Sequence, residues 1–158
     1  MDKCVLYTDG ASKGNPGDAG IGIVISEPDG TVIREIGEYV GKATNNVAEY
    51  KALIRGLQEC LELGATSVEI GTDSELLARQ ISGFYKVKSE RLKPLHGETM
   101  SILRHFRAVS ISHVAREFNR RADELANEGV RKKGRPPAKR RSEKPAGDGR
   151  GVQGELGF

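Results

Sequence analysis

The sequence lacks several features that would direct a protein to a membrane or to an oxidising compartment. Its 158 residues include no tryptophan and only two cysteines, Cys4 and Cys60. Both cysteines fall in segments that we expect to be buried, and two such residues do not form a disulfide framework. We therefore predict a reducing, cytoplasmic setting. No run of about 18 apolar residues occurs, so we predict no membrane span, and we expect no signal peptide from the opening Met1-Asp2-Lys3.

The net charge of +3 is unevenly distributed along the chain. Residues 131–158 hold nine Lys/Arg and three Asp/Glu, whereas residues 1–130 hold sixteen and nineteen. The basic end is also rich in glycine and proline and cannot bury enough apolar area to offset chain entropy. We predict one folded domain, residues 1–132, and a disordered basic tail, residues 133–158. The charge of the tail is as typical of a nucleic-acid contact as of a solubilising extension.

Apolar periodicity predicts an alternation of strands and helices. The predicted strands are 3–9, 19–27, 31–39, 67–72 and 108–114, and the predicted helices are 46–63, 74–82, 91–107 and 120–132. Asn46 and Asn119 are the expected N-caps of the first and last helices, and Pro28-Asp29-Gly30 predicts a hairpin turn. Three strands followed by βα units indicate an α/β domain. We expect a five-stranded mixed sheet, antiparallel over its first three strands, with helices on both faces.

Four carboxylates stand at the ends of these elements. Asp9 and Asp73 close two predicted strands, where α/β sheets form their sites. Glu49 and Asp123 fall in the opening turns of two predicted helices. Clustered carboxylates repel one another and raise one another's pKa unless a cation lies among them. Oxygen ligands suit hard ions, above all Mg²⁺, and a phosphate then completes the shell. The pattern predicts metal-assisted phosphodiester chemistry.

Each carboxylate also has a structural explanation when it is taken by itself. Asp9 could belong to a turn, and Glu49 could complete a capping box with Asn46. Asp73 could cap the helix that follows it, and Asp123 could favour the positive end of the last helix. The joint placement favours the functional interpretation, because two of the carboxylates lie where α/β sheets form their sites and the other two lie at helix starts, which also attract phosphate oxygens.

Four ordered motifs resemble those of type 1 ribonucleases H. The motifs are Tyr7-Thr8-Asp9-Gly10-Ala11-Ser12 with Gly14-Asn15-Pro16-Gly17, Asn45-Asn46-Val47-Ala48-Glu49-Tyr50, Thr72-Asp73-Ser74, and Arg116-Glu117-Phe118-Asn119 with Ala122-Asp123-Glu124-Leu125-Ala126-Asn127. The resemblance covers about residues 1–130 and leaves the tail outside. It implies a ribonuclease H-like fold and an endoribonuclease that cuts the RNA strand of RNA–DNA hybrids, leaving 5′-phosphate and 3′-hydroxyl ends.

The resemblance also implies a role for each carboxylate. Asp9 would bridge two Mg²⁺ ions, with Mn²⁺ as a candidate substitute, and Asp123 would help to hold the ion that activates the attacking water. Glu49 and Asp73 would hold the ion that supports the leaving oxygen. Two ions roughly 4 Å apart clamp both oxygens of an in-line displacement. Glu49 would also contact the 2′-hydroxyl, by which proteins tell RNA from DNA.

Main-chain and small polar groups are the expected substrate contacts. The matching family positions are Gly10, Ala11, Ser12, Asn15, Thr44, Asn45 and Ser74. Asn15 could equally belong to an ordinary turn, and Asn45 could serve in helix capping alone. Glu75 stands where many relatives carry glutamine, which weakens the predicted contact beside Ser74. The predicted partner is an RNA–DNA hybrid, with double-stranded RNA as a further candidate, and we expect a monomer.

Many relatives place a catalytic histidine in a loop before the fourth carboxylate, and this chain departs from that pattern. His113 is predicted to lie in the last strand, and the loop after it is too short for the usual histidine-bearing turn. We predict that Arg116 takes that role and His113 is structural, with the reverse assignment as the alternative. Arginine keeps its proton, so it could steady charge but could not shuttle protons.

The chain also resembles a short form of this family. Some relatives insert a basic helix with aromatic residues after the second helix, whereas residues 84–93 here offer only a modest basic patch. Two other classes stay open: a nucleic-acid-binding module that no longer cuts, and a different nuclease of the same superfold. The complete carboxylate set argues against the first class, and the four specific motifs argue against the second.

Overall fold

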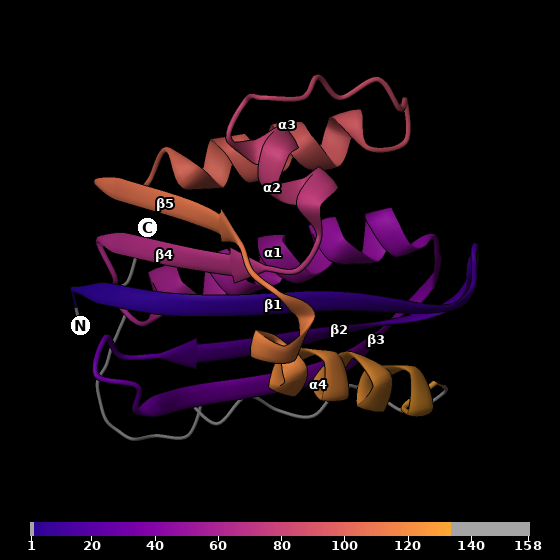
Figure 1. Cartoon of the computed structure of the whole chain (residues 1–158), viewed down its shortest axis with the longest axis horizontal. Helices are drawn as coiled ribbons and strands as arrows, with labels where there is room; N and C mark the ends of the chain where they lie inside the picture. The colour runs from indigo at the N-terminus through magenta and orange to yellow at the C-terminus, as the bar shows by residue number, and fades with distance from the viewer. Residues whose placement is uncertain (1, 134–158) are drawn as a thin grey trace.

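A single mixed sheet with helices on both faces forms the part of the chain that the computed structural model describes, residues 2–133 (Figure 1). The strands are β1 (Lys3–Gly14), β2 (Gly17–Ser26), β3 (Val32–Ala43), β4 (Ser67–Thr72) and β5 (Ala108–His113). The helices are α1 (Asn45–Glu62), α2 (Glu75–Ile81), α3 (Lys93–Leu103), the short 3₁₀ turn η1 (Arg116–Phe118) and α4 (Arg120–Arg131). The predicted tail lies outside the described residues, apart from Lys133.

The strand order is β3-β2-β1-β4-β5. β1 pairs antiparallel with β2, and β2 with β3, whereas β1, β4 and β5 run parallel. This arrangement confirms the predicted α/β fold with three antiparallel strands first. β1 is longer than predicted, because the glycine-rich segment after Asp9 stays in the ladder with β2 as far as the pair Gly14 and Gly17. The predicted helix 91–107 is shorter, since regular turns span only Lys93–Leu103.

The main apolar core lies between the sheet and α1. Alternate residues of β1 and β2, including Leu6 and Ile23, face this helix and are fully buried together with its Leu53 and Leu57. Both cysteines are buried within this core as small hydrophobic side chains, and neither is part of a disulfide. α4 packs on the opposite face over the antiparallel strands. None of the helices within residues 2–133 combines the length and apolar character that crossing a membrane requires.

One of the two predicted N-caps is wrong, and the other is confirmed in position only. The cap of α1 is Thr44, whose extended backbone lets its Oγ1 accept a hydrogen bond from the Val47 N–H at 3.2 Å. Asn46 therefore lies inside the helix, and a capping box with Glu49 is excluded. Asn119 is the N-cap residue of α4, as predicted, but its side chain makes no capping hydrogen bond. Its Nδ2 instead donates to the Thr8 carbonyl at 3.0 Å, because this buried oxygen on β1 lies beside the start of α4.

Candidate active site

Asp9 lies near the middle of β1 and is the central residue of the site. Its side chain is only 5% exposed. The Gly10 N–H donates to its Oδ1 at 2.9 Å. The neighbour of Asp9 across the antiparallel ladder is Gly22 on β2. Asp9 is thus held by a central strand, and its cross-strand neighbour Gly22 places no side chain next to it.

Glu49 reaches Asp9 because α1 lies unusually close to β1. A Cβ at Gly10 would lie 2.4 Å from the Ala48 carbonyl carbon and 2.5 Å from the Glu49 nitrogen. Such distances do not occur between a real Cβ and backbone, so only glycine permits this approach. The glycine that follows Asp9 therefore sets how near the Glu49 carboxylate can come. Gly10 was predicted as a substrate contact, and the structure gives it this additional packing role.

Asp123 is brought to the same place by a second close approach, on the other face of the sheet. A Cβ at Gly22 would lie 1.9 Å from the Ala122 carbonyl oxygen. The first turn of α4 therefore lies directly against β2 at Gly22, the residue that pairs with Asp9. The buried hydrogen bond from Asn119 to Thr8 ties the start of this helix to β1. Asp123 follows in the first turn, facing the strand that carries Asp9.

Asp73 comes from the parallel half of the sheet. It directly follows β4, whose last residue Thr72 pairs with Thr8 of β1. The chain turns sharply here, with the Ser74 N–H donating to Thr72 Oγ1 at 3.0 Å and Ser74 Oγ capping α2 by accepting from the Leu77 N–H at 3.1 Å. Ser74 is thus the cap of α2, and the alternative that Asp73 serves this purpose is wrong.

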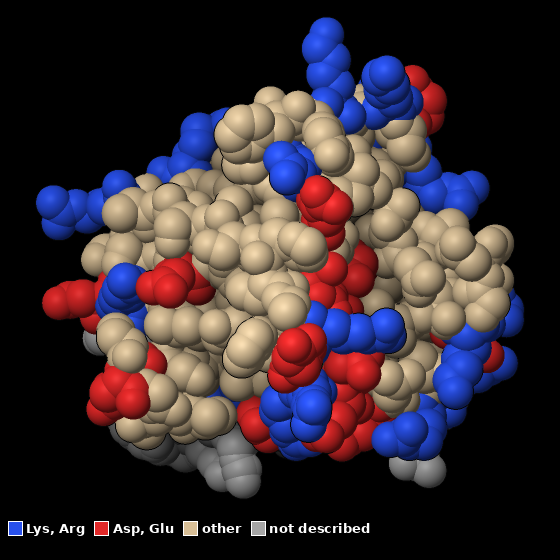
Figure 2. All heavy atoms as spheres, viewed as in Figure 1, with Lys and Arg blue, Asp and Glu red and all other residues tan. Residues whose placement is uncertain are grey.

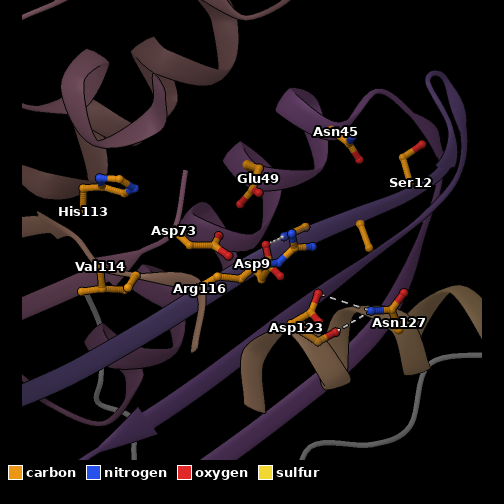
Figure 3. A pocket seen from close by; sticks show the side chains of 13 residues that line it. Asp9, Ser12, Asn45, Glu49, Asp73, His113, Val114, Arg116, Asp123 and Asn127 are labelled. Carbon is orange, nitrogen blue, oxygen red and sulfur yellow. Dashed lines mark hydrogen bonds between the residues drawn. The ribbon is translucent and has the colours of Figure 1, made fainter. Parts of the chain in front are cut away.

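The four carboxylates line one pocket of about 700 Å³. Asp9, Glu49 and Asp73 each present an oxygen, and the three oxygens lie within 4.8 Å of one another. Asp123 lies in the same pocket but outside this group, on the α4 side of Asp9 (Figure 3). Figure 2 shows acidic side chains gathered in the middle of this face, with basic side chains around them. Asp9 is the carboxylate that interacts electrostatically with all three others, Glu49, Asp73 and Asp123.

The electrostatics of the cluster favour a cation. Burial, together with the charge of Asp73, raises the pKa of Asp9 to about 7. Burial and the charge of Asp9 raise the pKa of Glu49 to about 10. Oε1 of Glu49 is buried and has no hydrogen-bond partner among the described residues. A hard divalent ion would supply both the missing partner and the missing positive charge. The residues present therefore fit a divalent metal.

The predicted substrate-binding residues divide into two groups. Gly10, Ala11, Ser12 and Asn45 line the pocket beside the carboxylates. Asn15, Thr44 and Ser74 are not among its lining residues and instead make hydrogen bonds at the starts of α1 and α2. The Asn15 side chain accepts from the Asn45 N–H at 3.0 Å, so it links the β1–β2 turn to the start of α1.

Arg116 and His113 both line the pocket. His113 is the last residue of β5, which confirms its predicted place in the strand. Arg116 opens η1, only three residues later, and its side chain extends toward Asp9 (Figure 3). The segment between them is as short as predicted. Arg116 is therefore the cationic side chain that this connection directs into the acidic pocket.

Asn127 lines the pocket as well, although it is not among the predicted site residues. Its Nδ2 donates to the carbonyl of Asp123 at 2.9 Å and lies 3.4 Å from Asp123 Oδ1. The available signal was its position four residues after Asp123, which places both side chains on one face of a helix. Val114 and Ala115, in the connection between β5 and η1, also line the pocket.

Comparison with known proteins adds family information to this geometry. A family model described as "Reverse transcriptase-like" matches residues 7–129. The chain is 43% identical over 129 residues to "Bifunctional protein Rv2228c" of Mycobacterium tuberculosis, covering 81% of this chain and 35% of the relative. It is 41% identical over 124 residues to "Ribonuclease HI" of Halobacterium salinarum, covering 78% and 62%. The chain thus spans less than two thirds of the length of these curated relatives.

Solved structures agree with the fold. The crystal structure of RNase H1 from Halobacterium salinarum matches with a TM-score of 0.80 and 40% identity, covering 82% of this chain and 98% of that one. LC11-RNase H1, solved in complex with an RNA/DNA hybrid, matches with a TM-score of 0.77 and 43% identity, covering 82% and 97%.

Proposed function

Because this chain belongs to the ribonuclease H family, we propose that it is an endoribonuclease that hydrolyses the RNA strand of RNA–DNA hybrids. The observation that carries the proposal is the convergence on one pocket of carboxylates from β1, α1, the residue directly after β4, and α4. Gly10, Ala11 and Ser12 line the same pocket, and their small size would let a nucleic-acid strand approach the carboxylates. The related LC11-RNase H1 binds such a hybrid in its solved complex.

The metal requirement follows from the oxygen donors. Glu49 and Asp73 would hold one divalent ion together with Asp9, and Asp123 would help to hold a second, with Asp9 shared between them. Mg²⁺ suits an all-oxygen set that a substrate phosphate completes, and Mn²⁺ is the expected substitute. When bound, the ions would supply an activated water and neutralise charge on the leaving oxygen, and the products would carry 5′-phosphate and 3′-hydroxyl ends.

Selection of RNA would rest on the wall formed by α1. Glu49 lines the pocket and could accept a hydrogen bond from a 2′-hydroxyl, which DNA lacks. Asn45 lines the same wall one turn earlier. Asn15, Thr44 and Ser74 would act on the substrate less directly, by holding the starts of α1 and α2. Double-stranded RNA carries the same 2′-hydroxyls and is the second substrate to test.

Arg116 would steady negative charge on the substrate or product. It keeps its proton and so could not serve as a proton shuttle. The measurement is the turnover number of Arg116→Ala and of His113→Ala on a hybrid substrate. We expect the arginine variant to lose turnover and the histidine variant to retain it. The reverse result would assign the role to His113.

The decisive experiment is cleavage of a strand-labelled RNA–DNA hybrid with Mg²⁺ by the wild type and by Asp9→Asn. Asp29→Asn is the matched control, because it makes the same chemical change in the β2–β3 turn and keeps the acceptor for the Thr31 N–H. We expect wild type and control to cut only the RNA strand and Asp9→Asn to lose activity. Tight hybrid binding without cutting, with either Mg²⁺ or Mn²⁺, would instead identify a binding module.

The proposed setting of this reaction is a reducing cytoplasm with a monomeric protein. Both cysteines are buried and neither is part of a disulfide, which supports a reducing compartment. Gel filtration with light scattering would measure the molar mass in solution. A mass of twice 17.1 kDa would contradict the proposed monomeric state.

A further inference from the structure

We propose that Asn127 is a positioning residue that holds the Asp123 carboxylate toward Asp9. This inference rests on the proposed function, because it concerns the same set of carboxylates. Its basis is that the side-chain amide of Asn127 lies against two oxygens of Asp123, one of the backbone and one of the side chain. Asn127 Nδ2 lies 2.9 Å from the backbone oxygen of Asp123 and 3.4 Å from its Oδ1, as the dashed lines in Figure 3 show.

The orientation of this amide follows from its neighbours. Both nearby atoms of Asp123 are acceptors, and only the nitrogen of an asparagine side chain can donate to them. The nitrogen must therefore face Asp123, which leaves Oδ1 of Asn127 directed away from it (Figure 3). Because the two residues lie four apart on α4, the helix itself keeps their side chains adjacent.

The helix that carries this pair has little freedom to move. A Cβ at Gly22 would lie 1.9 Å from the Ala122 oxygen, and one at Gly20 would lie 2.2 Å from the Ala126 oxygen. α4 thus lies against the backbone of β2 immediately before Asp123 and immediately before Asn127. With the backbone held so closely, the direction of the Asp123 carboxylate depends mainly on its side-chain rotamer. The amide of Asn127 restricts this rotamer.

Asp123 needs such restriction more than the other carboxylates do. Asp9, Glu49 and Asp73 already lie with oxygens within 4.8 Å of one another, whereas Asp123 is outside that group. Whether a second ion site forms between Asp123 and Asp9 therefore depends on where the Asp123 carboxylate points. A neutral amide suits this task, because it directs the carboxylate without adding a positive charge that would compete with a cation.

The test compares metal binding by wild type, Asn127→Ala and Asn127→Gln without any nucleic acid. The measured quantity is the rise in thermal-unfolding midpoint with Mn²⁺ concentration, which reports even weak binding to the folded state. Loss of a residue that orients a metal ligand typically weakens affinity by 10–100-fold. Because the contact to Oδ1 is long, we expect about 10-fold for Asn127→Ala, with partial recovery in Asn127→Gln.

Two comparisons isolate the role of Asp123. Glu128→Ala is the matched truncation on the same helix, since Glu128 is not a lining residue of the pocket and lies 3.7 Å from Arg121. It should leave Mn²⁺ affinity unchanged. In an Asp123→Asn background, Asn127→Ala should have little further effect on Mn²⁺ affinity, because the carboxylate that it positions is gone. An equal loss in both backgrounds would overturn the proposal.

Kinetics on an RNA–DNA hybrid separate positioning from direct substrate contact. We expect Asn127→Ala to need about 10-fold more Mg²⁺ for half-maximal rate, with KM for the hybrid within about twofold of wild type. A raised KM with unchanged metal requirement would show that Asn127 contacts the substrate, and the proposal would be wrong. If the wild type binds Mn²⁺ but cuts no hybrid, the proposed function fails, while the Mn²⁺ comparison still decides the role of Asn127.

Discussion

Gly10→Ala is the substitution that should most directly separate the carboxylates without removing one. The added Cβ would lie 2.4 Å from the Ala48 carbonyl carbon, whereas ordinary contacts begin near 3.4 Å. The start of α1 must therefore retreat from β1 by about 1 Å. Glu49 moves with it, because its own backbone nitrogen is 2.5 Å from the same Cβ position.

The expected loss has two parts. Overpacking of this kind costs about 1–3 kcal/mol of unfolding free energy. A displacement of about 1 Å at the reacting centre can lower turnover by roughly 100-fold. Mg²⁺ accepts ligand distances only near about 2.0–2.1 Å, so a displaced Glu49 should also raise the Mg²⁺ concentration needed for half-maximal rate.

The assay measures turnover on an RNA–DNA hybrid across Mg²⁺ concentrations, beside thermal unfolding. Gly97→Ala is the control, because a Cβ there would meet nothing within 4 Å and the residue is exposed on α3. That change should stabilise the protein by about 0.5–1 kcal/mol and leave turnover unaltered. If Gly10→Ala kept wild-type turnover and Mg²⁺ requirement, the close approach of α1 would not be what brings Glu49 to Asp9.

Further predictions concern the buried polar groups. The pKa of Asp9 is about 7 in the folded protein against a usual 3.8, so the folded state binds this proton more tightly than the unfolded chain does. The resulting stabilisation of the folded state should be complete below about pH 4 and lost as pH rises through 7. The unfolding midpoint of metal-free protein should fall over that range, and Mg²⁺ or Asp9→Asn should reduce the fall; a flat profile without metal would contradict this reasoning. Tyr50→Phe removes the donor that lies 2.6 Å from buried Gln80 Oε1 and should cost about 1–3 kcal/mol in urea unfolding, so an unchanged midpoint would indicate that another donor replaces it. Asn119→Ala removes the donor that lies 3.0 Å from the Thr8 carbonyl, and a similar loss of stability is expected. Turnover should fall more than hybrid affinity, because the start of α4 carries Asp123. A fall in hybrid affinity alone would refute this reasoning.

The element order and the four carboxylates were predictable because their signals are local. Apolar alternation and helical spacing indicated the strands and helices, and motifs of a few residues marked Asp9, Glu49, Asp73 and Asp123. The structure confirms the mixed sheet and brings all four carboxylates to one pocket. Errors occurred where several local candidates compete, as at the start of α1, where Thr44 is the cap although Asn46 was predicted.

The tertiary structure alone decided how the carboxylates come together. The approach of α1 depends on Gly10 meeting Ala48, and that of α4 depends on Gly22 meeting Ala122. The hydrogen bond from Asn119 to Thr8 joins residues 111 positions apart. These contacts depend on strand register and on the distance between a helix and the sheet, which local periodicity does not encode. The sequence by itself therefore determined which oxygens the protein offers to a metal, and packing decided how closely they approach one another.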